Sequence, residues 1–277
     1  MKNSTWNPVR RNRNIGTAKS GYSNDNKFVV PEKWADYRVF WERLENPVAC
    51  PLSIKGHNVT LLVEPTRPGY IHACTPNDIE RVLSLIDIEH LEEIDLVVLR
   101  QPKKKEELLH PVWGRFIYYA DIGKYSGPGV YIEAVATNTT IRWGNKLSPF
   151  QKKELEALES DGHRIERVKR GYDVQTTPET VRNTQLFRTL PHEIGHAVDY
   201  LTNSLNPSIE TDSEHESEYI SEVYRSKPTR DKEEFANRYA REFYEKHSSD
   251  ENLPFDREYV KENIIGLGLC ESWFLHK

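Results

Sequence analysis

The sequence predicts an α+β fold in which a small mixed sheet is followed by helices that carry polar side chains. Three observations support this prediction. Short runs rich in β-branched and aromatic residues, which are typical of strands, lie between residues 58 and 137. Helix start signals, a serine or threonine followed by proline, occur at Ser148 and Thr177. The segment from Thr229 to His247 repeats aromatic residues every four positions, as an amphipathic helix does.

Length and composition indicate a globular protein. The chain has 277 residues, of which 37% are hydrophobic and 29% charged, so it can fill a core. One large domain with an appendage fits this length best. We expect a flexible basic tail at 1–28, an N-terminal α/β portion at 29–110 packed on the rest, and a main domain at 111–277. The tail has no acid before Asp25, and a solvated tail is the expected role, with a binding arm as the alternative.

Charge and cysteine content exclude several classes of protein. The net charge of -5 carries no nucleic-acid signature, because the one acid-free basic stretch is the tail. Cys50, Cys74 and Cys270 are isolated and lack CxxC spacing, which favours a reducing compartment. The N-terminus has no apolar signal-peptide core, and no later run is long enough to span a membrane. We therefore expect a cytoplasmic protein without nucleic-acid or membrane partners, although leaderless export and the oligomeric state stay open.

The first half of the chain predicts the sheet. A helix with a wide aromatic face is expected at 31–44, and a second helix at 77–86. The run KKKEE at 103–107 lies between two strand candidates and is expected to be a solvated turn. Four strands are expected, at residues 58–65, 94–101, 115–122 and 129–137.

The second half predicts mainly helices. Ser148, a following proline and Gln151 form a capping box that starts a helix ending near residues 161–162. A further strand is possible at 164–168. A long helical stretch runs from Thr177 towards Leu201, and Pro191 inside it implies either a kink or a new helix starting near Thr189.

The acidic segment 206–219 is expected to be an exposed loop. A loop bordering the functional cleft, where it would favour basic substrates, is the alternative.

The motif HEIGH within the long helical stretch is the strongest functional signal. His192 and His196 are four residues apart, so on a helix they project from one face, where both imidazoles can reach one metal ion. Glu193 lies beside the ion as a candidate base for a bound water. Gly195 fits a place where a bulky residue would crowd another element. The alternative is an ordinary helix whose two histidines are satisfied by hydrogen bonds.

A catalytic zinc site needs a third protein ligand and an open position. No further histidine follows at the spacing of the three-histidine class, so the third donor is expected to be a carboxylate on a later helix. The best such helix is 229–247, where Phe235, Tyr239 and Phe243 form an apolar face that can dock on the first helix. Glu233 and Asn237 share an adjacent face of that helix.

The wording HEIGHAVDY followed by EEFANRYA resembles the gluzincins, the glutamate-ligand zinc metallopeptidases, and within them the group of anthrax lethal factor and the Pro-Pro endopeptidases. The resemblance implies a zincin-like metallopeptidase domain at 111–277 that binds one Zn²⁺. It implies His192, His196 and Glu233 as ligands and Glu193 as the base.

Asn237 stands where the family usually has an acid that orients a ligating histidine. Glu234 is the competing ligand, but Arg238, four residues on, is a poor partner for a ligating imidazole.

The family also places a tyrosine several residues before the ligating glutamate, where its hydroxyl stabilises the oxyanion. In this chain Ser226 occupies the expected position, so Tyr224 is the chosen candidate and Tyr219 the alternative. Resemblance to zinc peptidases also makes 129–137 a candidate edge strand for an extended peptide, and an interior strand is equally compatible with its sequence.

These features predict hydrolysis of peptide bonds in a peptide or protein substrate, with Glu193 as general base. The second hypothesis is a regulatory or interaction protein with little turnover, because EEFANRYAREF also resembles a helix of repressor-associated and stress-regulator metalloproteins. The intact Glu193 favours the enzyme, since a scaffold needs no base. The remaining histidines lack partners at ligand spacing and are expected to be structural or exposed.

Overall fold

The computed structural model describes residues 39–109, 112–137 and 139–275, with helices and strands both well represented. Residues Trp41–Lys277 form one compact unit. The predicted tail at 1–28 and most of the predicted helix at 31–44 lie outside the described residues. No helix in the described part of the chain is long and apolar enough to cross a membrane.

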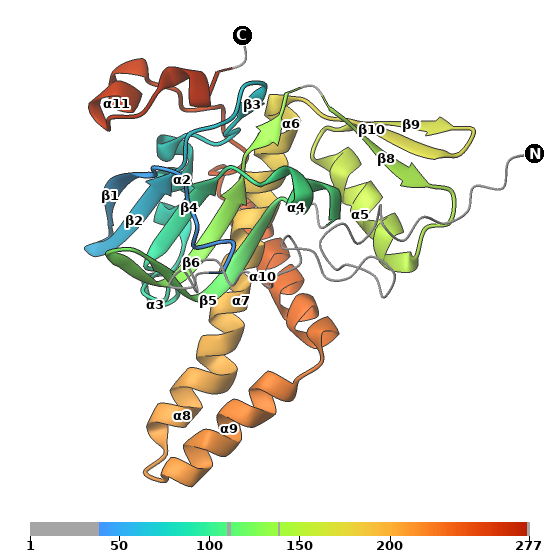
Figure 1. The fold of residues 1–277 in the computed structure, drawn as a ribbon. Helices are drawn as coiled ribbons and strands as arrows, with labels where there is room; N and C mark the ends of the chain where they lie inside the picture. Colours follow the sequence, from blue (N-terminus) through green and yellow to red (C-terminus); the bar gives the residue numbers. More distant parts are fainter. Residues whose placement is uncertain (1–38, 110–111, 138, 276–277) are drawn as a thin grey trace, which may run out of the picture. The chain divides into compact units, whose positions relative to one another are not determined.

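The centre of this unit is a five-stranded mixed sheet in the order β1-β2-β4-β6-β5 (Figure 1). The outer pairs β1/β2 and β5/β6 are antiparallel, whereas β2/β4 and β4/β6 are parallel. Strands from both sides of the boundary predicted at residue 110 belong to this one sheet, because β4 pairs with β6. The strands are β1 (Val48–Ile54), β2 (His57–Val63), β4 (Leu96–Arg100), β5 (Gly114–Ile122) and β6 (Tyr125–Glu133).

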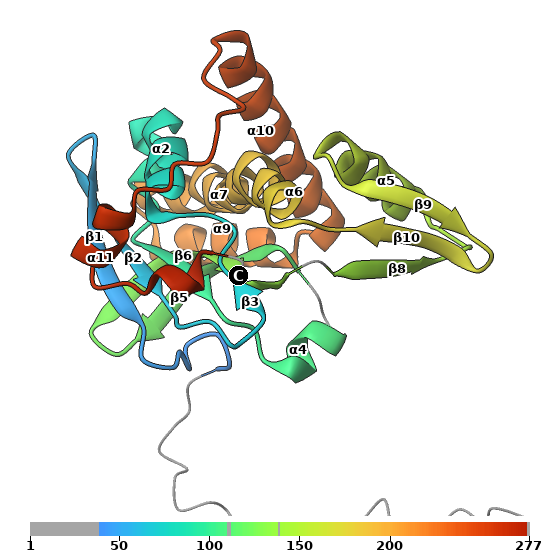
Figure 2. The same cartoon turned by 90° about the horizontal axis from the view of Figure 1, so that it is seen from above.

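Helices cover one face of this sheet. α2 (Pro76–Leu85), α7 (Leu190–Tyr200) and α10 (Thr229–Ser249) lie on the same side (Figure 2) and contribute to one apolar core with the strands. All five residues of β4 are buried, as expected for a central strand covered on both faces. A smaller apolar cluster around Leu62, Val98 and Tyr131 lies on the other face.

A second sheet, in the order β8-β10-β9, is antiparallel and lies beside α5 (Figure 2). The predicted capping box is present at Ser148, whose hydroxyl accepts from the Gln151 N–H, and the predicted strand at 164–168 is confirmed. A two-stranded sheet pairs β3 with β7. These elements are β3 (Tyr70–Ile71), β7 (Val135–Ala136), β8 (Thr140–Gly144), α5 (Pro149–Ser160), β9 (Arg164–Val168) and β10 (Gly171–Gln175).

The long helical stretch begins after Thr177, which caps α6 (Pro178–Asn183), and contains a π-helical segment at Thr184–Thr189 directly before α7. Thr189 and Leu190 keep right-handed helical dihedrals, so the helix does not restart at Pro191. Proline lacks an N–H and clashes with the carbonyl four residues earlier, and a wider turn relieves both problems. This π-helical turn takes the place of the kink or new helix expected from the sequence.

The predicted acidic loop at 206–219 is wrong for most of its length. A second π-helical segment at Leu201–Leu205 leads into α8 (Asn206–Glu210), and α9 (Glu214–Ser226) returns beside it as a helical hairpin (Figure 1). Ser213 caps α9, and two glutamates in its first turn suit the positive end of the helix. The predicted turn at 103–107 is also wrong, because Lys104–Leu109 form the short helix α4. The chain ends with α11 (Lys261–Gly266) and a 3₁₀ turn at Glu271–Trp273.

Candidate metal centre

Helix α7 presents the three residues of the HEIGH motif together. The imidazole rings of His192 and His196 have centroids 4.8 Å apart and planes at 87°. One ligand atom of each ring and a carboxylate oxygen of Glu193 all lie within 4.8 Å of one another, close enough to share a metal ion. The spacing of four residues therefore places the rings as predicted on one face.

Helix α10 lies directly against this part of α7. A Cβ atom on Gly195 would be 2.9 Å from the Cα of Ala236, a distance that real Cβ atoms essentially never show. Both residues are buried, and glycine opposite alanine lets the two backbones meet. The sequence expectation for Gly195 is confirmed, and the contact sets the position of the residues one turn before Ala236.

The close contact brings Glu233 to both imidazoles. One carboxylate oxygen lies 3.4 Å from Nε2 of His192, and the other lies 3.6 Å from Nε2 of His196. Ligand atoms around one tetrahedral zinc ion are about 3.4 Å apart when each bond is about 2.1 Å long. The two N–O separations are close to this value, but they involve different oxygens of Glu233, and the group whose ligand atoms all lie within 4.8 Å of one another consists of His192, Glu193 and His196.

Glu234 is placed quite differently from its neighbour. Its side chain is 63% exposed and pairs with Arg230, with an N–O distance of 2.8 Å. The geometry therefore separates the two glutamates that the sequence left in competition. Glu193 and Glu233 both face the imidazole pair, so one carboxylate can bind an ion while the other stays free to handle a proton.

Burial dominates the electrostatics of Glu193. Removal from water raises the pKa of this carboxyl to about 7, although the charge of His192 and the Phe116 N–H act in the opposite direction. Burial and the charge of His192 lower the pKa of His196 to about 4. The pKa of Glu233 is lowered, first by its hydrogen bond with His192.

Opposing effects act on the pKa of His192. Burial lowers its pKa, but Glu233, Glu193 and the side chain of Asn237 together raise it above the ordinary value. The hydrogen bond from Asn237 thus acts on His192.

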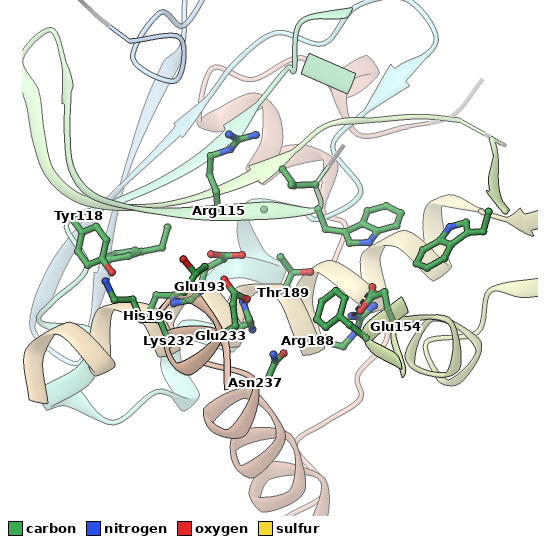
Figure 3. Close-up of a pocket in the computed structure, with 18 residues that line it drawn as sticks. Arg115, Tyr118, Glu154, Arg188, Thr189, Glu193, His196, Lys232, Glu233 and Asn237 are labelled. Atoms are coloured by element: carbon green, nitrogen blue, oxygen red, sulfur yellow. Dashed lines mark hydrogen bonds and ion pairs between the residues drawn. The ribbon is translucent and has the colours of Figure 1, made fainter. Parts of the chain in front are cut away.

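These side chains line a cavity of about 710 Å³ between β5, α7 and the start of α10. Figure 3 shows Glu193, His196 and Glu233 gathered in the middle, with Tyr118 and Lys232 on one side and Arg188 and Glu154 on the other. The strand that borders this cavity is β5, which is the last strand of the sheet. Of the two alternatives for 129–137, the interior strand is confirmed and the edge strand is not, because β6 lies inside the sheet, between β4 and β5.

Tyr224 does not line the cavity. Its side chain is buried on α9, and its hydroxyl donates to Asp199 Oδ2 at 3.1 Å. Tyr219 is 62% exposed on the same helix and does not line the cavity either. The tyrosine in the cavity is Tyr118, which the sequence reasoning missed. The register of β5 against β6 shifts between Ile117 and Ala120, and such a bulge redirects the side chains within it.

The neighbouring hydrogen bonds bear on whether the Tyr118 hydroxyl donates or accepts. Asp199 is fully buried and forms an ion pair with Lys227 at 3.0 Å, and its carboxylate accepts a hydrogen bond from the Tyr224 hydroxyl. The Tyr118 and Tyr224 oxygens are 3.3 Å apart. Since Tyr224 already donates to Asp199, Tyr118 is the donor when the two tyrosines are hydrogen-bonded, and its oxygen then offers lone pairs to a ligand in the cavity.

Lys232 supplies a positive charge in the same cavity. Its ammonium group lies 4.5 Å from the ring centre of Tyr224 and has no carboxylate partner in the part of the chain that the structure describes. The other two cavity-lining cations do have such partners. Arg115 pairs with Glu133, and Arg188 pairs with Glu154. Lys232 was not identified from the sequence, where one lysine among many carries no signal.

Among the other histidines, His72 and His163 are buried, and they are hydrogen-bonded to the Glu64 carbonyl and to Thr184, respectively. They fit the expected structural role.

Comparisons of the chain with protein-family models, with curated proteins and with solved structures found no match. Function is therefore inferred from the side chains themselves.

Proposed function

We propose that this chain is a zinc-dependent endopeptidase of the gluzincin type, with a zincin-like domain that holds one Zn²⁺. His192, His196 and Glu233 would hold the ion, and Glu193 would be the general base. The observation that carries the proposal is the convergence of Glu233, from a separate helix, on both imidazoles of the HEIGH motif. Two histidines and a glutamate are the ligand set of many peptide-hydrolysing zinc sites.

A bound zinc ion would polarise the scissile carbonyl and lower the pKa of its water to about 7. Glu193 is positioned to take the proton from the attacking water and to return it to the leaving amine. Burial raises its pKa to about 7, and a base that titrates near the working pH can both accept and donate. The N–H of Phe116 in β5 holds this carboxylate at the edge of the sheet.

The other cavity residues would bind the peptide. No strand lies on the outer side of β5 in the part of the chain that the structure describes, so this edge could pair with an extended chain through main-chain hydrogen bonds. The ammonium group of Lys232 would stabilise the negative charge that develops on the carbonyl oxygen. The Tyr118 oxygen would accept a hydrogen bond from a substrate N–H, so we assign the stabilising role to Lys232 and a supporting role to Tyr224, through Asp199 and Tyr118.

A regulatory or interaction protein with little turnover is the second candidate. The helical hairpin of α8 and α9 favours it, because Ile209, Tyr219 and Val223 are 72%, 62% and 50% exposed. Exposed apolar side chains of this size mark interaction surfaces when they cluster. In that case Glu193→Gln would leave the function intact.

The proposal is tested by metal analysis of the purified protein after dialysis with zinc. We expect one zinc ion per chain in the wild type, and loss of that ion in His192→Ala and Glu233→Ala. Glu234→Ala is the matched control and should keep its zinc, since its side chain faces solvent. Retention of zinc in Glu233→Ala with loss in Glu234→Ala would refute the ligand assignment.

Activity is tested on the same preparations with a peptide library read by mass spectrometry. The wild type should cleave internal peptide bonds, and Glu193→Gln should bind zinc normally but lose at least about a hundredfold in kcat. Zinc binding without any cleavage, together with an unchanged partner-binding profile in Glu193→Gln, would favour the regulatory protein.

A further inference from the structure

A second cavity, of about 840 Å³, adjoins the metal-side cavity. Val112, Trp113, Arg115 and Trp143 line both. The second cavity lies where β6 and β7 meet the small sheet, and α5 borders it as well. Glu154 of α5 lies across the metal site from Tyr118 (Figure 3), so the small sheet and α5 flank one end of the candidate active site.

The walls of the second cavity are mainly apolar. They include Val135, Ala136, Ile141, Leu147 and Val181 besides the two tryptophans. These side chains come from separate elements, and such concave apolar walls are typical of ligand sites.

Several charged groups of this cavity are paired. Glu133 is 3% exposed and accepts from Arg100 at 3.0 Å and from Arg115 at 3.1 Å. Glu106 pairs with Arg100 at 2.6 Å. Lys104 and Lys146 also line the cavity and have no ion pair within the part of the chain that the structure describes, so the case for an apolar ligand rests on the apolar walls and not on the charges.

The edge strand leads from the metal site to this cavity. The N–H of Phe116 contacts Glu193, and Trp113, three residues earlier, is part of the shared wall. Gly114 between them packs against the π-helical segment before α7, since a Cβ there would be 2.7 Å from the Thr189 side chain. A peptide paired with β5 has the same rise per residue as the strand. The peptide residue that lies beside Trp113 is therefore about three residues away from the bond at the metal site.

We infer that the second cavity binds a large apolar side chain, aromatic or leucine-sized, of the peptide whose scissile bond lies at the metal centre, two to four residues from that bond. The inference rests on the proposed peptidase function. The shared walls favour a segment of the same peptide over a separate small ligand. The protein would thus select a peptide for one bulky apolar residue away from the scissile bond. The residues at the scissile bond itself would occupy the smaller cavity beside Glu193 and Lys232.

Zinc-loaded Glu193→Gln protein provides a test that does not depend on turnover. Its affinity is measured by calorimetry for a set of alanine-based peptides in which a single phenylalanine is moved one position at a time. Burying a phenylalanine side chain contributes about 1.5–3 kcal/mol, so phenylalanine at the favoured position should tighten binding by about 10- to 100-fold over alanine.

Two substitutions, each added to Glu193→Gln, put a polar side chain into the second cavity only. Ile141→Asn and Leu147→Asn should each reduce the phenylalanine preference to less than about threefold while leaving the affinity for the all-alanine peptide unchanged. Ile265→Asn is the matched control, because Ile265 is 54% exposed on α11, and it should keep the full preference. Circular dichroism of each variant checks folding, and two independent positions keep the test decisive if one variant misfolds.

Three results would overturn the inference. The peptides could show no phenylalanine preference, or a preference only at the residues of the cleaved bond. The preference could also persist in both cavity variants. Failure of the proposed function has a different signature. A phenylalanine preference that both cavity variants abolish, in a protein whose wild type binds zinc but cleaves none of the peptides, would keep the binding cavity and refute hydrolysis. Cleavage without the preference would refute the cavity alone.

Discussion

Gly195 of α7 and Ala236 of α10 are in direct backbone contact, with room for no Cβ atom on the glycine. The same site would bring a Cβ to 3.1 Å from the Cβ of Tyr239. This contact sets the separation of the two helices at the level of the metal centre. Glu233 reaches both imidazoles because the helices are this close.

Gly195→Ala should therefore weaken both folding and zinc binding. Overpacking of a core contact costs about 1–3 kcal/mol, whereas alanine in place of glycine in an open helix stabilises by about 1 kcal/mol. We expect a lower free energy of unfolding in urea and zinc affinity reduced by at least tenfold. Gly266→Ala on α11 has nothing within 4 Å, so it should leave the zinc affinity unchanged and should not lower the free energy of unfolding. A Gly195→Ala protein as stable as the wild type would contradict the packing account.

At alkaline pH, the metal-free Glu193→Gln protein should be more stable to unfolding than the metal-free wild type. The folded state raises the pKa of this carboxyl from 4.5 to about 7, so the folded protein holds the proton more tightly than the unfolded chain. Stability is lost as the pH rises from about 4.5 to 7, and this loss is roughly 3 kcal/mol. Glu193→Gln cannot lose a proton, so its advantage over the wild type should grow by that amount between pH 4.5 and 8.

Urea unfolding in the presence of a chelator measures this difference at both pH values. Glu234→Gln, whose side chain is 63% exposed, should differ from the wild type by less than about 0.5 kcal/mol throughout. An advantage of Glu193→Gln that is equal at both pH values would show that Glu193 is not held by burial as described.

Tyr224→Phe should affect stability more than catalysis. It removes the donor to Oδ2 of the buried Asp199, and an unsatisfied buried acceptor costs about 1–3 kcal/mol. Tyr118 is 43% exposed, so Tyr118→Phe should cost less than about 1 kcal/mol. Steady-state kinetics of Tyr224→Phe should show less than a tenfold drop in kcat. A drop of a hundredfold or more, with unchanged stability, would restore Tyr224 as the direct oxyanion stabiliser.

Lys232→Met should lower kcat and kcat/KM by the same factor, about 10- to 100-fold, with little change in KM. A charge that acts only on the transition state has this effect, whereas a charge that binds the substrate raises KM instead. Zinc content should stay at the wild-type value. Arg230→Met is the control, since Arg230 is 83% exposed and lies outside the cavity.

The buried ion pair between Asp78 of α2 and Arg182 of α6 should be important for stability. Asp78 is fully buried and the Arg182 side chain is 4% exposed, with an N–O distance of 2.8 Å. Arg182→Met leaves the Asp78 charge buried without its partner, which costs about 3–5 kcal/mol. Arg142→Met breaks a pair whose arginine is 74% exposed and should cost less than about 1 kcal/mol in the same urea titration.

Local signals in the sequence were sufficient for several parts of this structure. The capping box at Ser148, the four strands near 58–137 and the helix predicted at 229–247 depend on neighbouring residues, and all are present, the helix as Thr229–Ser249. The helical hairpin at 206–226 was missed because a high density of acids was interpreted as solvation. The structure shows that Ser213 and the glutamates after it form a good helix start.

Helical periodicity needs only residues a few positions apart, so the HEIGH motif is sufficient to predict that His192 and His196 share one face of a helix with Glu193 beside them. Three other features depend on long-range packing: Glu233 and not Glu234 faces the imidazoles, β5 is the edge strand, and Tyr118 lies in the cavity in place of Tyr224. Each of these outcomes depends on contacts between elements far apart in the chain. The missing side chain of Gly195 and the bulge in β5 have their effects only after the helices and the sheet have packed together.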